Sequence, residues 1–441
     1  MDPMSPRSPL LTPIDLRGST GDVRGHLPSP VAGDEGPTAS VREILALVRD
    51  DGDSALRDLT ERFDGVRIED LRVSPAEVSA ALDEIPADLR DALEVAHSNI
   101  ADYHRTQLHP DIRHEKDGIV VREVRRAVER AGLYVPGGRA PLASTVLMTA
   151  APGRVAGVGT LAMCSPPGPD GRIAPAILAA AAIAGVDEVY RVGGAQAIGA
   201  LAYGTESIPA VDVIVGPGNR YVAIAERLVA GEGAVGVPSA FTGPSEVAVV
   251  ADASTPVEFA AVDIVVQAEH GPDGLAYLIT WSEEAASAIT AEVDRITAAS
   301  PRRAEIESTL DRGGFCILVD SPEQAMRVAN GVAAEHLELL NDDPESLLPL
   351  LRNAGAVFLG PWAPASLGDY AAGPNHVLPT ARSARFGSAL RVDDFCKFIH
   401  IVDVERSALE RLAPHVAAMA LSEGLAAHAD SVLIRAADRS R

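Results

Sequence analysis

The sequence has little cysteine and few aromatic residues, and both shortages exclude kinds of protein. Its three cysteines, Cys164, Cys316 and Cys396, lie far apart in no paired spacing. That spacing excludes a disulfide scaffold and a thiolate metal site, and it fits a reducing cytosol. Aromatic residues make up 4% of the chain, whereas alanine, valine and glycine are abundant. Small side chains suit tight packing of helices on a sheet, which favours an α/β fold over a β-sandwich.

Basic residues and long apolar runs are also scarce. The formal net charge is −24 and no stripe of lysine or arginine is present, so a nucleic acid would be repelled. The longest apolar run, Ala174 to Val186, is too short to span a bilayer. Residues 1–13 lack the apolar core of a signal peptide, so we expect a flexible lead-in. We expect a cytoplasmic protein that binds neither nucleic acid nor membranes.

A chain of 441 residues predicts more than one domain. Helices are expected at residues 38–63 and 75–107, where apolar residues recur at helical spacing. Between residues 131 and 240, short β-rich runs alternate with alanine-rich helical runs, which is typical of a doubly wound parallel sheet. The strands expected there are 132–135, 160–164, 188–192, 211–215 and 234–237.

A second α/β region extends to about residue 380. Its expected strands are 246–251, 276–280, 314–319 and 356–359. Residues 407–437 read as a helical tail whose apolar stripe needs a partner surface.

Four strands of the first region end in turns rich in glycine and proline. In an open parallel sheet such turns share one edge, where ligands bind and helix N-termini offer N–H groups to phosphate. None of these turns contains the Gly-x-Gly-x-x-Gly fingerprint, and the nearest run, Gly216 to Tyr221, ends in tyrosine. The pattern supports a dinucleotide site and plain turn chemistry equally.

Two short segments carry residues that suit a metal or a proton. Gln267 and His270 are three residues apart at the end of a helix, so both side chains share one face and could bind a metal, or serve as a cap and a surface residue. Glu335 and His336 could give one pocket two proton acceptors. On a strand, adjacent side chains face opposite ways, so this requires the backbone to turn at that point.

Two later segments are equally ambiguous by themselves. Residues 368–379 place Asp369 and His376 among glycines and prolines, as ligand-binding loops and structural loops both do. Glu423 and His428 lie on the helical tail, where a solvated face is the simpler reading. From the residues alone, the prediction ends at a possible metal site.

Taken together, the segments resemble the histidinol dehydrogenase family over nearly the whole chain, from about Ile14 to Arg435. The resemblance is carried by ordered stretches at residues 132–138, 141–148, 192–198, 241–246, 267–272, 335–337 and 368–380. It implies a homodimeric enzyme of histidine biosynthesis that oxidises L-histidinol through L-histidinal to L-histidine with Zn²⁺ and two NAD⁺. It also implies two Rossmann-like domains with doubly wound parallel sheets, small helical extensions at both ends and an intertwined dimer.

The resemblance also implies a division of the chain. Residues 38–130 with 241–380 would form a first α/β domain that carries most catalytic residues, and 131–240 a second with the NAD-contacting turns. Residues 1–37 would be a lead-in and arm, and 381–441 a helical tail that reaches the partner subunit.

The family pattern assigns roles to individual residues. Glu335 and His336 fall on proton acceptors: His336 would take the hydroxyl proton, and Glu335 would deprotonate the water that hydrates the aldehyde. The other implied sets are the zinc ligands Gln267, His270, Asp369 and His428; the NAD contacts Tyr134, Gln196 and Asn219; and the substrate contacts Ser245, Gln267, His270, His336, Asp369, Glu423 and His428.

Three rival functions remain open on these residues: a sister dehydrogenase for another small alcohol, a zinc hydrolase without NAD, and a non-catalytic binding protein. The turns with Tyr134 and Asn219 weigh against the hydrolase, and the pair of Glu335 and His336 against the binding protein. Ala365 stands where many relatives carry an acidic residue and could alter the support of Asp369.

Overall fold

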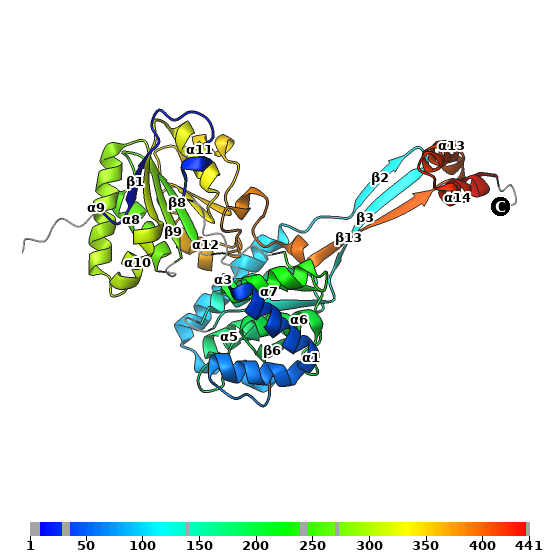
Figure 1. The fold of residues 1–441 in the computed structure, drawn as a ribbon, viewed down its shortest axis with the longest axis horizontal. Helices are drawn as coiled ribbons and strands as arrows, with labels where there is room; N and C mark the ends of the chain where they lie inside the picture. The colour runs from blue at the N-terminus through cyan, green and yellow to red at the C-terminus, as the bar shows by residue number, and fades with distance from the viewer. Residues whose placement is uncertain are drawn as a thin grey trace, which may run out of the picture. The chain divides into compact units, whose positions relative to one another are not determined.

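The computed structural model describes residues 9–28, 36–137, 141–238, 243, 245–269 and 273–437. The chain divides into two compact units (Figure 1). The first comprises residues 1–107 and 129–395, and the second residues 108–128 and 396–441. The first unit contains two parallel sheets with helices, which confirms the α/β prediction.

The larger sheet of the first unit has six parallel strands in the order β1-β10-β9-β8-β11-β12. Its strands are β1 (Thr12–Asp15), β8 (Glu246–Ala251), β9 (Leu275–Thr280), β10 (Gly314–Leu318), β11 (His336–Leu339) and β12 (Ala356–Leu359). Along β8, Val247 and Val249 pack beneath helices α8 (Val257–Ala268), α9 (Glu283–Ala299) and α10 (Arg303–Gly313). Ala248 and Val250 face the opposite side, towards α11 (Pro322–Val332). Both faces of the sheet are therefore buried.

The smaller sheet of the first unit has the order β6-β5-β4-β7, also parallel. Its elements are β4 (Arg130–Tyr134), β5 (Thr160–Ser165), β6 (Glu188–Arg191) and β7 (Val213–Val215), with α4 (Ala143–Ala156), α5 (Pro175–Ile183), α6 (Gly194–Tyr203) and α7 (Arg220–Gly231). The expected strand at 234–237 is reduced to one bridge between Gly236 and Val213.

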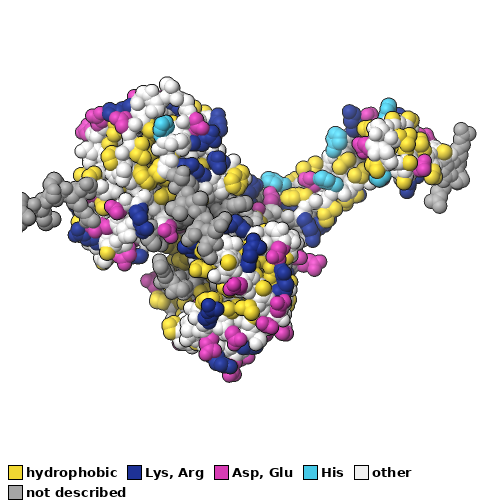
Figure 2. All heavy atoms as spheres, in the orientation of Figure 1, with side chains coloured by type: hydrophobic (Ala, Val, Ile, Leu, Met, Phe, Trp, Pro, Cys, Tyr) yellow, Lys and Arg dark blue, Asp and Glu magenta, His cyan; other side chains and the backbone are white. Residues whose placement is uncertain are grey.

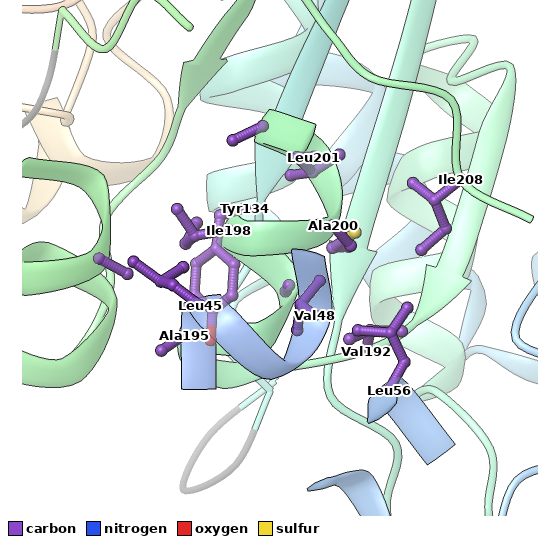
Figure 3. Close-up of a cluster of buried hydrophobic side chains, with 14 of the residues drawn as sticks. Leu45, Val48, Leu56, Tyr134, Val192, Ala195, Ile198, Ala200, Leu201 and Ile208 are labelled. Carbon is purple, nitrogen blue, oxygen red and sulfur yellow. The ribbon is translucent and has the colours of Figure 1, made fainter. Parts of the chain in front are cut away.

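The N-terminal helices complete this smaller domain. They are α1 (Gly36–Asp64), α2 (Pro75–Glu84) and α3 (Ala87–Arg105), so the long helix expected at 75–107 is interrupted at Ile85 and Pro86. Leu45, Val48 and Leu56 of α1 pack against α6 in one buried cluster (Figure 3), and α2 and α3 contact α5 and α4. The sequence-based domain division joined residues 38–130 to residues 241–380. In the structure, α1 instead packs with the smaller sheet, because its apolar face is buried against α6.

Two further segments differ from the sequence-based expectation. Residues 12–15, expected within a flexible arm, form β1 and pair in parallel with β10. Residues 336–339, for which no strand was expected, form β11 between β8 and β12.

The second unit is built on an antiparallel sheet in the order β13-β3-β2. Its strands are β2 (Ile112–Lys116), β3 (Ile119–Ala127) and β13 (Cys396–Val404), followed by α13 (Arg406–Ser422) and α14 (Ala426–Ala437). The two helices are present as expected, but the expected helical tail at 381–441 also contains β13, which pairs with β3 along its whole length.

The surface of this second unit is rich in apolar side chains. Figure 2 shows hydrophobic groups along the sheet and on the helices. The large apolar residues exposed there are Ile112, Phe398, Ile399, Val402, Val404, Leu412, Met419, Leu421, Leu425, Leu433 and Ile434. Across the described residues, no helix has the length and apolar character needed to cross a membrane.

Candidate active site

The two expected proton acceptors lie where a helix gives way to a strand. Helix α11 ends at Val332, the next residue, Ala333, has a left-handed φ of 51°, and β11 begins at His336. Glu335 occupies the short link between them. This turn of the backbone brings both side chains together, with Nδ1 of His336 3.6 Å from Oε2 of Glu335. The backbone therefore turns at this point, as it must if Glu335 and His336 are to serve one site.

The imidazole of His336 is held from two sides. Its Nδ1 lies 3.2 Å from the carbonyl oxygen of Glu246 on β8, and its Nε2 lies 3.1 Å from Oδ1 of Asp369 on α12 (Ala365–Tyr370). Burial opposes the charged imidazole, but the carboxylates of Glu335 and Asp369 outweigh it, and the pKa of His336 is raised to about 9. Since both ring nitrogens face oxygen atoms, this arrangement suits an imidazole that carries a proton on each.

Glu335 is buried and has a specific partner. Its Oε2 accepts a hydrogen bond from the backbone N–H of Glu246 at 3.0 Å. Burial raises the pKa of Glu335 to about 7, although His336 and the N–H of Glu246 favour its charged form. A carboxyl group with a pKa near neutrality is well suited to accept and return a proton at physiological pH.

A cavity of about 540 Å³ opens beside these residues within the first unit. His336, Asp369 and His376 lie in its wall, with Phe358 of β12 and Arg391. Nδ1 of His376 lies 2.9 Å from the carbonyl oxygen of Asp369, which fixes the loop after α12. The cavity is large enough for a small polar substrate.

Of the four expected zinc ligands, the structure describes Gln267 and Asp369 in the first unit and His428 in the second. Gln267, on α8, is buried, and its Nε2 has no hydrogen-bond partner. Asp369 contacts His336, as described above. His270 lies outside the described residues. His428 and the expected substrate contact Glu423 belong to the second unit, where both are exposed.

These residue types fit zinc chemically. Carboxylate oxygen and imidazole nitrogen are its usual ligands after thiolate, and an amide oxygen is an uncommon one. A metal beside Gln267 would bind its Oε1, whereas the unpartnered Nε2 is a donor and would need a separate acceptor. Among the described residues, histidine, cysteine, aspartate and glutamate do not gather in any group of three that could hold a metal.

The expected NAD contacts lie at the carboxyl edge of the smaller sheet. Tyr134 ends β4, and its buried hydroxyl accepts the N–H of Gly194 at 3.0 Å. Gln196 is buried in the first turn of α6. Asn219 caps α7, accepting the N–H groups of Tyr221 and Val222 at 2.9 and 3.2 Å. This is the edge at which open parallel sheets bind ligands.

Two buried acids were missed by the sequence reading. Glu246 begins β8, and burial followed by Glu335 raises its pKa to about 8. Glu338 is fully buried on β11, and its Oε1 accepts the N–H of Ala365 at 2.9 Å. Glu246 opens the otherwise apolar run 246–251, and Glu338 lies between two leucines; an acid beside such apolar residues is the sequence signal that could have identified them.

Ser245, an expected substrate contact, directly precedes β8 and is half-buried. Its side chain favours the charged form of Glu335 through a hydrogen bond. Thus Ser245, Glu335, His336 and Asp369 are brought together in the first unit.

The fold and this pair of buried proton acceptors define an α/β enzyme equipped for acid–base chemistry. The histidinol dehydrogenase family model matches residues 30–436. Histidinol dehydrogenase of Synechococcus sp. is 48% identical over 400 residues, covering 90% of this chain and 92% of that protein. The Chlorobaculum tepidum enzyme of the same name is 44% identical over 414 residues, covering 94% and 96%.

A solved structure agrees with these sequence matches. The crystal structure of histidinol dehydrogenase from Elizabethkingia anophelis superposes with a TM-score of 0.92 at 35% identity, covering 97% of this chain and 98% of that one. The chain belongs to the histidinol dehydrogenase family, and it is therefore an enzyme of the NAD-dependent oxidoreductase class.

Proposed function

We propose that the protein oxidises L-histidinol through L-histidinal to L-histidine, using Zn²⁺ and two NAD⁺, as a cytoplasmic enzyme of histidine biosynthesis. The observation that carries the proposal is the contact of His336 with both Glu335 and Asp369 beside a cavity of suitable size. The names of the relatives support the substrate.

His336, in its neutral form, takes the hydroxyl proton in the first oxidation; a zinc ion held by Asp369 would offset the carboxylate charge that otherwise favours the protonated imidazole. The carbonyl oxygen of Glu246 fixes Nδ1, which leaves Nε2 on the side of Asp369 and the cavity to exchange protons. The alcohol loses this proton and a hydride, which passes to the nicotinamide, and becomes the aldehyde. An imidazole held in one orientation needs no rearrangement before the transfer.

Glu335 serves the second oxidation. Water must add to the aldehyde before a second hydride can leave, and a base must take a proton from that water. Oε2 of Glu335 lies 3.6 Å from Nδ1 of His336, close enough for the two bases to serve one substrate. Two proton acceptors in one pocket account for two successive oxidations without a cysteine nucleophile.

Gln267, His270, Asp369 and His428 would hold the zinc ion. When bound, zinc supplies orientation of the substrate's imidazole and amine. Ser245 and Glu423 would add substrate contacts. For NAD, Tyr134, Gln196 and Asn219 offer a hydroxyl, an amide and a capped helix N-terminus at one sheet edge, in a Rossmann-like arrangement.

The protein is proposed to act as an intertwined homodimer. The second unit exposes apolar residues along β13 and on both helices, which a second copy of the chain would cover. Glu423 and His428 lie on this same unit, so dimerisation would add them to the site of the partner. A hybrid of a His428→Ala and a His336→Ala subunit then contains one intact site.

Two experiments test these proposals. Purified protein with L-histidinol, NAD⁺ and Zn²⁺ should form two NADH per L-histidine; turnover of another alcohol alone would favour a sister dehydrogenase. Separately, the two inactive variants should regain activity after mixing. Verified heterodimers that remain inactive would exclude the shared site without affecting the substrate assignment.

A further inference from the structure

The short helix α12 has no capping side chain of its own. Its N-cap residue is Pro364, which makes no side-chain hydrogen bond to the first turn. Instead, Glu338 reaches across from β11 and accepts the N–H of Ala365 at 2.9 Å. A carboxyl group is a favourable partner for a helix N-terminus. The cap of α12 therefore comes from the strand that carries His336.

Two contacts consequently join β11 to α12. Glu338 meets Ala365, and His336 meets Asp369. Two residues along a strand span about 6.6 Å, and four residues along a helix span about 6 Å. The near equality of these lengths lets both contacts form at once, with the helix running opposite to the strand.

Close approach of α12 to the sheet is visible at a third point. A Cβ added to Gly368 would lie 2.5 Å from the ring of Phe358. Phe358 is the residue of β12 in register with Glu338. Because Gly368 has no side chain, α12 can lie directly on β12, next to β11 and Glu338.

The side chain of Glu338 also faces α8. Burial, followed by the carboxyl of Asp263 on α8, raises the pKa of Glu338 to about 8, and its Oε2 has no hydrogen-bond partner. Asp263 lies four residues, or about one helical turn, before Gln267. Glu338 thus contacts α12 one helical turn before the expected zinc ligand Asp369.

We propose that Glu338 is a positioning residue: it holds α12 on β11 so that Asp369 meets His336. The inference rests on the proposed roles of His336 and Asp369. The hydrogen bond to Glu338 uses the backbone N–H of Ala365, so position 365 does not need an acidic side chain.

The test compares Glu338→Ala with Glu338→Gln. The amide of glutamine retains an oxygen acceptor for the N–H of Ala365, whereas alanine removes it. Glu338→Ala should weaken zinc affinity, measured by competition with a chelator, by about 10- to 100-fold, and lower kcat more than it raises KM. Glu338→Gln should stay close to the wild type in both respects.

Gln324→Ala is the matched control. Gln324 is buried on the other face of the same sheet, where its side chain accepts the N–H of Asp320 and donates to the carbonyl of Leu16. This variant should lose stability without losing zinc affinity. If Glu338→Ala does not fold, Glu338→Asp, one methylene shorter, should show a smaller loss of the same kind.

Amide hydrogen exchange of residues 367–370 in metal-free protein gives a readout independent of turnover. Exchange should accelerate in Glu338→Ala but not in Glu338→Gln or Gln324→Ala. Equal behaviour of Glu338→Ala and Gln324→Ala, or no rescue by glutamine, would overturn the inference. Failure of the wild type to oxidise L-histidinol would instead count against the proposed function and leave the exchange result interpretable.

Discussion

Nε2 of His336 lies 3.1 Å from Oδ1 of Asp369, although the two residues come from a strand and a helix that are separated by a 3-10 helix and another strand. The same imidazole contacts the carbonyl of Glu246 through Nδ1. With Nδ1 held by this carbonyl, Nε2 is the nitrogen that can exchange a proton with a group in the cavity. This geometry underlies the first prediction.

Glu335→Gln and His336→Gln should affect different oxidation steps. Loss of His336 should lower the rate of the first hydride transfer from L-histidinol by about 10²- to 10⁴-fold. Glu335→Gln should leave that first transfer largely intact and slow the second, so a single turnover yields one NADH and bound aldehyde. Rapid-mixing absorbance at the NADH band, with aldehyde trapping, measures both. Equal losses in both steps for both variants would contradict separate roles.

Asn219 should combine a cap with a cofactor contact. Asn219→Ala removes an acceptor for two N–H groups and should cost about 1 kcal/mol in urea unfolding. Asn219→Asp keeps the cap and should retain stability, yet its negative charge should weaken NAD⁺ binding measured by calorimetry. Unchanged NAD⁺ affinity in the aspartate variant would show that the helix end lies away from the cofactor.

Gly216 should not tolerate a side chain. Its φ is 127°, and a Cβ there would lie 2.2 Å from the carbonyl oxygen of Tyr134, a backbone atom that no rotamer change can move. Gly216→Ala should therefore lower the free energy of unfolding by about 1–3 kcal/mol or more. Gly231→Ala, at the end of α7 with nothing within 4 Å, is the control and should gain up to about 1 kcal/mol. Comparable stabilities of the two variants would refute the steric explanation.

Asp64 should make stability depend on pH. Burial raises its pKa from 3.8 to about 6, and its Oδ2 has no hydrogen-bond partner. A carboxyl whose pKa is raised in the folded state favours folding when protonated, and that contribution is lost as the pH rises from about 4 through 6. Asp64→Asn should thus be more stable than the wild type at pH 7 to 8.

The expected gain is about 1 kcal/mol, because partial exposure of Asp64 screens the roughly 3 kcal/mol that a shift of two pKa units represents. The difference should vanish near pH 4. Denaturant unfolding at a series of pH values measures it, and a difference that stays constant from pH 4 to 8 would rule out titration of Asp64 as its origin.

Local patterns predicted the smaller sheet well. Strands β4, β5 and β6 were expected within two residues of their observed ends, because buried strands alternating with alanine-rich helices leave a strong periodic signal. Pairings between distant segments leave no such signal. The partner of β13 is β3, far earlier in the chain, and the partner of β1 is β10.

In the site, too, the local pairs of residues could be predicted from the sequence and the distant contacts could not. Glu335 and His336 stand out in the sequence, but their convergence depends on the turn at Ala333, and the partner Asp369 is supplied by tertiary packing. Only the family resemblance joined these residues beforehand. The role of Glu338 could not be predicted from its neighbours, because its hydrogen-bond partner, the N–H of Ala365, lies 27 residues further along the chain.

The link between α11 and β11 is short, and its length sets which residue serves as the base. Side chains alternate along β11, so His336 and Glu338 face α8 while Leu337 and Leu339 enter the core beneath α11. Inserting or deleting one residue between Ala333 and His336 would exchange these two sets of side chains. The imidazole would enter the apolar core and a leucine would replace it in the cavity. The length of this link is therefore as tightly constrained as the identity of Glu335 within it.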